Sequence, residues 1–287
     1  MSKIYFLTYS SNKDFNFSKK HLLNTAKESN FFEETFSYSL KDLSADFVTR
    51  YKDILYMKRG GGYWIWKLDI VNQILNSLNK NDLLVYMDAG STLNYFAKVK
   101  FNDYCETLLS SDYGVLNFSN NFIEREWTTK HLFDYFDVSL SSEIAKSPQI
   151  EATNIIFKKN DHSKNFLREF ERLLEFDPYL VTDKYNSFQN SEYFIENRHD
   201  QSVMSLLSKI HGSVLFDNET NFKNRESEQY KYPFLSTRHS RQDLLFKFIY
   251  YLNNKKSSKH PRFFLPNDLS IEKKLLRKYF YFNFPHL

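Results

Sequence analysis

The alternation of apolar and polar positions predicts strands and helices in turn along most of the chain. Apolar runs of strand length lie at 3–9, 34–39, 83–87, 113–118 and 153–157. Apolar residues recur at intervals of three and four, which is helical spacing, over 19–30, 45–57, 69–78, 163–176 and 201–210. Strands that alternate with helices are typical of an α/β fold whose sheet is mostly parallel at its start.

The run at 83–87 is continuous, and polar residues bound it on both sides. Such a run is typical of a central strand that is buried on both faces. Ligands of open α/β sheets bind beyond the carboxyl ends of the strands, which is where Asp88 would lie. Its carboxylate could hold a divalent ion or a ribose hydroxyl, and the alternative is an aspartate that only forms the turn.

Composition narrows the class of protein. Hydrophobic residues make up 41% of the 287 residues and charged residues 26%, so the chain can form a core and is not expected to be disordered. The single cysteine, Cys105, excludes a disulfide framework and a cysteine-ligated zinc site, and we expect a half-buried thiol in a helix. The sequence contains neither a signal peptide nor an apolar stretch of about 18 residues, so we expect a soluble, cytoplasmic protein.

Charge divides the chain into two parts. Residues 231–287 contain 12 Lys and Arg against 3 Asp and Glu, whereas the other 230 residues contain 27 against 32. We therefore expect a first domain over 1–235 and a basic, aromatic extension over 236–287, with helices at 242–252 and 269–282. The amphipathic pattern of 271–282 favours an anionic membrane surface, at the inner face of the cell membrane, over nucleic acid. A helix packed on the first domain is the alternative.

Three of the six glycines are consecutive. Gly60, Gly61 and Gly62 lie between Arg59 and an aromatic run that ends at Lys67. A glycine turn that opens a helix can present backbone N–H groups and the positive end of the helix dipole to an anion. Arg59 and Lys67 would add positive charge to such a site. The alternative is an ordinary loop whose tryptophans fill the core.

Two further polar segments could carry chemistry. Four functional side chains, 198–201, open the last helix of the pattern, so Asp200 could be a general base and His199 a base or metal ligand. Asp200 could instead only cap the helix. The segment 124–128 is expected to be a polar loop, in which Glu126 is either a catalytic residue or part of a solvated charge cluster.

Together these segments resemble the GT-A type glycosyltransferases of bacterial capsule, lipopolysaccharide and related gene clusters. The resemblance spans residues 3–212 and rests on RGGGYWIWK at 59–67, YMDAG at 86–90, EWT at 126–128, QIEATNIIF at 149–157 and RHDQS at 198–202. The glycine–tryptophan motif and the His-Asp-Gln-Ser motif are fairly specific as a pair in this order. The chain departs from the family in two places, because Asp-x-Asp becomes Asp88-Ala89-Gly90 and a frequent proline is replaced by Leu68.

The resemblance implies a single Rossmann-like, nucleotide-sugar-binding GT-A domain with a basic helical extension. It implies transfer of a sugar from a nucleoside diphosphate donor to a glycan or lipid-linked acceptor in surface polysaccharide synthesis. The donor that it favours is a UDP-sugar. It places Thr8 and Tyr9 near the base and ribose, and it gives Asp88 the role of holding Mn²⁺ or Mg²⁺. The donor pocket would be formed by Arg59, Gly60, Gly61, Gly62, Trp64, Lys67, Ala89 and Gly90.

In this interpretation Asp200 is the base toward the acceptor hydroxyl if the reaction inverts the anomeric centre, and it orients the donor sugar if the reaction retains it. Arg59 or Lys67 would stabilise the charge that develops on the leaving diphosphate. The alternative function is a catalytically silent module that binds sugar or nucleotide within a polysaccharide assembly system, since Asp-x-Asp keeps a single acid here.

Overall fold

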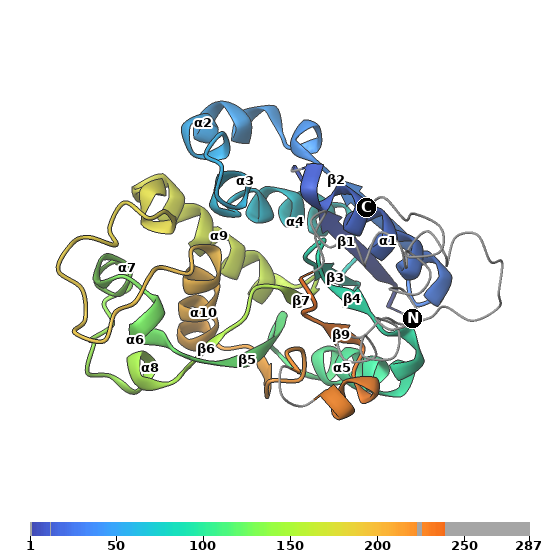
Figure 1. Cartoon of the computed structure of the whole chain (residues 1–287). Helices are drawn as coiled ribbons and strands as arrows, with labels where there is room; N and C mark the ends of the chain where they lie inside the picture. The colour runs from blue at the N-terminus through green and yellow to red at the C-terminus, as the bar shows by residue number, and fades with distance from the viewer. Residues whose placement is uncertain (1, 12, 223–225, 239–287) are drawn as a thin grey trace, which may run out of the picture.

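The computed structural model describes residues 2–11, 13–222 and 226–238, which form a twisted sheet with helices on both faces (Figure 1). The strands are β1 (Ile4–Tyr9), β2 (Glu34–Tyr38), β3 (Leu83–Met87), β4 (Thr92–Leu93), β5 (Val115–Ile123), β6 (Pro148–Ile150), β7 (Asn154–Lys158), β8 (Val214–Phe216) and β9 (Phe234–Leu235). The α-helices are α1 (Lys13–Ser29), α2 (Ala45–Leu55), α3 (Gly60–Tyr63), α4 (Trp66–Ser77), α5 (Lys98–Ser110), α6 (Glu124–Trp127), α7 (Lys130–Tyr135), α8 (Glu143–Lys146), α9 (Asp161–Phe176) and α10 (Asp200–His211). Short 3₁₀ helices are η1 (Leu40–Asp42), η2 (Tyr95–Ala97), η3 (Pro178–Val181) and η4 (Glu226–Lys231).

The main sheet has the strand order β2-β1-β3-β7-β5-β6, and β8 pairs with β5. β1 pairs in parallel with both β2 and β3, so the parallel start expected from the sequence is confirmed. β7 is antiparallel to β3 and to β5, and β5 therefore runs in the same direction as β3. The expected α/β class is confirmed, with a mixed sheet in its second half.

β3 lies at the centre of the sheet because all five of its residues are apolar and buried. Leu84 and Tyr86 face a core that includes α2, α4, α9 and α10, whereas Leu83, Val85 and Met87 face a second core with α1 and α5. Alternate side chains of a strand point to opposite faces. A strand covered on both faces therefore needs a continuous apolar run.

Several segments differ from the sequence expectations. α1 begins at Lys13 instead of residue 19, β5 covers Val115–Ile123 instead of 113–118, and α5, α7 and α8 were not expected. The segment 124–128 begins with the helical turn α6 instead of a polar loop, because Glu124 is fully buried and accepts hydrogen bonds from Thr128 Oγ1 (2.6 Å) and Lys209 Nζ (2.7 Å). Cys105 lies in a helix as expected, α5, but it is buried instead of half-buried, at 4% exposure.

The C-terminal end of the described chain packs against the start of the sheet. β9 pairs with β4 in antiparallel register, and Thr237 Oγ1 donates to Gly90 O at 2.9 Å. Ser236 and Thr237 thus bond to Asn154 of β7 and to the turn after β3. The rest of the expected extension, 239–287, including both of its expected helices, lies outside the described residues. Within the described part of the chain, no helix is long and apolar enough to span a membrane.

Candidate functional site

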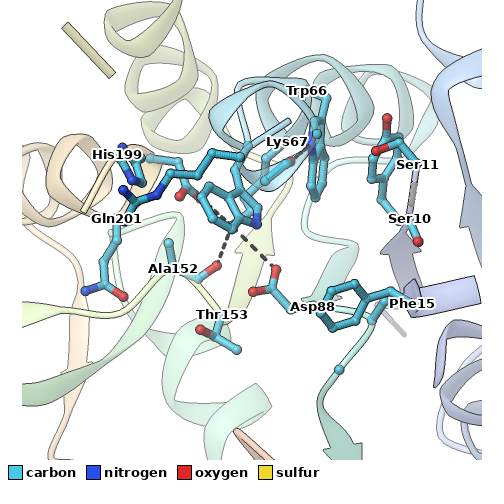
Figure 2. Close-up of a pocket in the computed structure, with 18 of the residues that line it drawn as sticks. Ser10, Ser11, Phe15, Trp66, Lys67, Asp88, Ala152, Thr153, His199 and Gln201 are labelled. Carbon is cyan, nitrogen blue, oxygen red and sulfur yellow. Dashed lines mark hydrogen bonds and ion pairs between the residues drawn. The ribbon is translucent and has the colours of Figure 1, made fainter. Parts of the chain in front are cut away.

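A pocket of about 360 Å³ opens where β1 and β3 end, at the edge of the sheet where the sequence placed a site (Figure 2). Its walls come from the residues that follow β1 and β3, those that precede β7, the first turns of α4 and α10, and residue 238. The volume lies in the range of small-molecule sites. The predicted site residues that line it are Tyr9, Arg59, Gly60, Gly61, Trp64, Lys67, Asp88, Ala89, Gly90, His199 and Asp200.

Lys67 is the charged centre of the pocket floor. Its side chain is 1% exposed, and its Nζ donates to Asp200 Oδ2 at 2.5 Å and to Ala152 O at 2.7 Å. Asp88 Oδ1 lies 3.7 Å from the same nitrogen, and Figure 2 shows Lys67 beside Asp88 and Ala152. Burial alone would lower the pKa of Lys67, but the negative charges of Asp200 and Asp88 outweigh it and raise that pKa. One buried ammonium therefore holds two carboxylates that come from different elements.

Asp200 is a buried acid with the properties of a proton acceptor. It is the first residue of α10, and it is 5% exposed. Burial raises the pKa of Asp200 to about 6, with Asp88 adding to the rise and Lys67 opposing it. A base works best when its pKa lies near the operating pH, so at neutral pH this carboxylate is ionised and still able to take a proton.

Asp88 presents its carboxylate to the pocket from the turn after β3. Its side chain is 30% exposed, and its Oδ1 accepts a hydrogen bond from Tyr86 Oη at 2.5 Å. Burial, followed by the charge of Asp88, raises the pKa of Tyr86 well above its usual value, so this hydroxyl remains a donor. The Asp88 carboxylate is thus oriented by two side chains: Tyr86, which belongs to β3, and Lys67, which belongs to α4.

The glycine run forms a left-handed turn and not the open anion cradle that we expected. φ is +58°, +59° and +96° at Gly60, Gly61 and Gly62, and it stays positive at Tyr63 and Trp64. The N–H groups of Gly61, Gly62 and Tyr63 donate to backbone carbonyls of residues 57–59. The expectation that these N–H groups bind an anion is therefore wrong. Glycine is required at 62, because a Cβ there would lie 2.6 Å from the Cα of Leu55, the last residue of α2.

His199 lines the pocket as a neutral imidazole. Its Nδ1 lies 3.0 Å from Val181 O and must carry the proton, because a carbonyl oxygen only accepts. Burial, followed by the charge of Arg59, lowers the pKa of His199 to about 4. The ring stacks on Trp64 with centroids 5.6 Å apart, and its buried Nε2 has no hydrogen-bond partner among the described residues. This nitrogen is an acceptor, and it lies 3.8 Å from Asp183 Oδ1.

Arg59 and Lys67, the two expected anion partners, are already paired with carboxylates. Arg59 Nη1 lies 3.1 Å from Asp183, and its Nη2 lies 3.2 Å from Glu196. Lys67 is held by Asp200 as described above. Both side chains still line the pocket, but their charge is largely balanced by the protein itself.

Three predicted site residues do not line the pocket. Thr8 is fully buried within β1, Gly62 packs against the backbone of α2, and Glu126 lies on α6, where its carbonyl accepts from the N–H of Ile195. Sequence reasoning also missed lining residues, among them Arg198 and Arg238. Arg198 belongs to the motif at 198–202 and could have been found there, whereas no motif surrounds Arg238.

The residues around Asp88 do not fit the Mn²⁺ or Mg²⁺ that the sequence led us to expect. No group of three or more His, Cys, Asp and Glu side chains within the described ranges could hold a metal ion. The nearby carboxylate of Asp200 is bonded to Lys67, and the raised pKa of Lys67 keeps its ammonium charged 3.7 Å from Asp88 Oδ1. A divalent ion on that oxygen would be repelled by this ammonium, which already supplies positive charge to both acids.

Comparison with known proteins gave matches among solved structures only. No protein-family model and no curated protein matches the sequence. Three of the similar structures are a glycosyltransferase involved in glycosylation of the major capsid of PBCV-1, xyloside xylosyltransferase 1 from mouse, and the galactosyltransferase LgtC with donor and acceptor sugar analogues. Their TM-scores are 0.43, 0.41 and 0.37, at 12%, 8% and 12% identity.

The same alignments cover 81%, 81% and 85% of this chain and 91%, 93% and 81% of the three neighbours, in the order given above. These three TM-scores are all below 0.5.

Proposed function

We propose that this protein is a glycosyltransferase whose donor is a nucleoside diphosphate sugar, and that a UDP-sugar is the preferred donor. The observation that carries the proposal is the pairing of Asp200 and Asp88 with the one buried ammonium of Lys67, on the floor of a pocket lined by further basic residues. Transfer of sugar to a hydroxyl needs a proton acceptor beside a site for an anionic leaving group. The glycine–tryptophan and His-Asp-Gln-Ser motifs, which carry the resemblance to GT-A enzymes, meet in this pocket.

In the proposed step, a hydroxyl oxygen of the acceptor bonds to the anomeric carbon of the donor sugar. The bond from that carbon to the diphosphate oxygen breaks, and its electron pair stays on the diphosphate. Asp200 takes the proton of the hydroxyl, while Lys67 keeps the carboxylate in place. If the product retains the anomeric configuration, Asp200 instead orients the donor sugar, so the stereochemistry of the product decides its role.

The two ends of the pocket suit different parts of the substrates. Figure 2 shows Phe15 at one end and His199 at the other, with Lys67 and Asp88 between them. At the first end Phe15, Tyr9 and Trp66 line the pocket, although Tyr9 and Trp66 are buried and stack on each other with ring centroids 3.8 Å apart. An aromatic wall suits a nucleobase. We place the base and ribose there, and the sugar and acceptor hydroxyls near His199 and Asp200.

The acceptor is proposed from the resemblance as a glycan or lipid-linked sugar of surface polysaccharide synthesis. Contact of the basic extension with an anionic membrane stays a prediction from the sequence, because its helices lie outside the described residues.

The proposal is tested with a panel of UDP-, GDP-, dTDP- and CMP-sugars. We expect a UDP-sugar to raise the melting temperature, since a ligand that binds the native state stabilises it, and to be converted slowly to free UDP. A donor that binds without any release of nucleotide, with or without candidate acceptors, would indicate the silent binding module instead. If no nucleotide sugar changes the melting temperature, the proposed function is wrong.

A further inference from the structure

The pocket wall holds more positive charge than the protein neutralises. Among the described residues, five basic side chains line the pocket against two carboxylates. Arg59 and Lys67 are paired with acids, as shown above. Of the three others, Lys58, Arg198 and Arg238, Arg198 shares the carboxylate of Glu196 with Arg59, at 3.9 Å. With Asp183 and Glu196 included, four carboxylates thus face five cations. Unbalanced charge of one sign in a pocket favours a ligand of the opposite sign.

Arg198 is held in place by stacking, and its one ion pair among the described residues is long. Its guanidinium carbon lies 4.2 Å from the ring centroid of Trp127 and 4.7 Å from that of Phe122. Glu196 is the nearest acid, 3.9 Å from Arg198 Nη1. The buried Nε of Arg198 has no hydrogen-bond partner among the described residues. A planar guanidinium that is fixed by its faces presents its N–H groups at the edge, where phosphate oxygens bind.

Arg238 comes to the same pocket from the C-terminal segment. Two preceding side chains fix this segment beside the turn after β3: Ser236 Oγ accepts from Asn154 Nδ2 at 3.0 Å, and Thr237 Oγ1 donates to Gly90 O at 2.9 Å. Burial lowers the pKa of Arg198, the charge of Glu196 opposes that fall, and the positive charges of Arg238 and Arg59 add to it. Arg198 and Arg238 line the same pocket, so an anion bound there would meet two positive charges.

We infer that Arg198 and Arg238 bind the diphosphate of the donor and neutralise it as it leaves, so that the diphosphate is held without a divalent ion. This inference rests on the proposed function and deepens it. The two arginines lie on the wall of the same pocket as Lys67 and Asp200, where a diphosphate could reach them while the sugar lies at the acid. Protein cations thus do here what a metal would do beside Asp88, whose surroundings do not fit one.

The test is isothermal titration of the full-length protein with UDP, GDP, CDP, dTDP and inorganic pyrophosphate, in EDTA and in Mg²⁺. We expect UDP to bind equally well in both. Arg198→Gln and Arg238→Gln should each weaken UDP binding by about tenfold or more, which is the effect of losing a charge-assisted hydrogen bond. UMP should lose less affinity than UDP. Arg168→Gln, at an exposed side chain of α9 whose Nη1 donates to Asn165 Oδ1, is the matched control.

The outcomes separate this inference from the proposed function. Wild-type protein that binds none of the diphosphates overturns both. Wild-type protein that binds UDP only in Mg²⁺ overturns the inference and restores Asp88 as a metal ligand. If UDP binds in EDTA but both arginine variants bind like the wild type, the assignment of these arginines is wrong. Arg238 is exposed, so Arg238→Gln gives a folded variant even if Arg198→Gln proves unstable.

Discussion

Lys67 Nζ and Asp200 Oδ2 lie 2.5 Å apart inside the protein, although 133 residues separate them in the sequence. Removing one partner of a buried pair leaves the other charge without compensation, which destabilises a protein by about 3–5 kcal/mol. We expect Lys67→Met to lose stability of that order in urea unfolding. Lys130→Met, which breaks an exposed pair with Asp134, is the control and should change stability by less than about 1 kcal/mol. Equal losses in the two variants would contradict the role of Lys67.

Asp200→Asn should separate binding from transfer. The amide keeps the size of the side chain but cannot take a proton, so we expect nucleotide affinity close to wild type and a transfer rate lower by about 10² or more. Initial rates of nucleotide release with acceptor, together with titration of UDP, measure the two effects. Asp161→Asn, at the exposed first turn of α9, is the control. A transfer rate near that of the wild type would leave Asp200 only as the first residue of its helix.

The transfer rate should rise with pH until Asp200 is ionised. Its pKa is raised to about 6, so the active form is lost as the pH falls through that value, by about tenfold for each unit below it. Because Asp200, Lys67 and Asp88 interact, the pKa read from the profile belongs to the cluster. The measurement is a profile of initial rates from pH 4.5 to 8. A flat profile would show that no group of this kind titrates in the rate-limiting step.

A second buried acid makes stability depend on pH in the opposite sense to most carboxylates. Burial raises the pKa of Glu151 to about 7, above its ordinary value of 4.5. The folded protein therefore holds this proton more tightly than the unfolded chain, and the stability it contributes is present below pH 4.5 and lost as the pH rises through 7.

Glu151→Gln mimics the protonated acid. We expect it to match the wild type at pH 4 and to be more stable at pH 8, by at most about 3 kcal/mol for a shift of this size. Urea unfolding at the two pH values is the measurement. Glu143→Gln, at a side chain that is 95% exposed, should leave the difference between the two pH values unchanged. A Glu151→Gln variant with the same pH dependence as the wild type would show that this acid is ionised throughout.

The left-handed turn gives a paired prediction at adjacent glycines. A Cβ at Gly62 would lie 2.6 Å from the Cα of Leu55, which is backbone, whereas one at Gly61 would lie 2.2 Å from the hydroxyl of Ser11, which can rotate away. Both positions have positive φ, which costs a residue with a Cβ about 1–2 kcal/mol. Gly62→Ala should therefore lose clearly more stability than Gly61→Ala in thermal unfolding. The reverse order would show that the backbone of α2 yields easily.

The local pattern predicted most of the long elements, but not α5, α7 or α8, and not the contacts between elements. The limits of β3 were predicted to the residue, and α9 and α10 to within two residues at each end, because their apolar periodicity is unbroken. α6 was missed because the burial of Glu124 depends on Lys209, which is 85 residues away. Local polarity alone predicts a loop in that position.

Of the site, the acids were predicted from the sequence, whereas the direction of the glycine N–H groups and Arg238 were not. The carboxylates followed from their positions after a buried strand and at a helix start, and both do line the pocket. The glycines indicated positive φ, but their sequence does not say where the N–H groups point. Arg238 could not be predicted, because only the pairing of β9 with β4 brings that part of the chain to the pocket.

The pairing of β4 with β9 also sets when the pocket can be completed during synthesis. Thr92 meets Thr237 through a 2.9 Å hydrogen bond, yet the ribosome makes the second 145 residues after the first. Every strand of the main sheet and both acids of the pocket floor are made before residue 238, since β8 ends at Phe216. A nascent chain that has not yet released residue 238 therefore lacks one wall of the pocket. Translation that stops before this point yields a chain without Arg238, one of the two arginines inferred to bind the diphosphate.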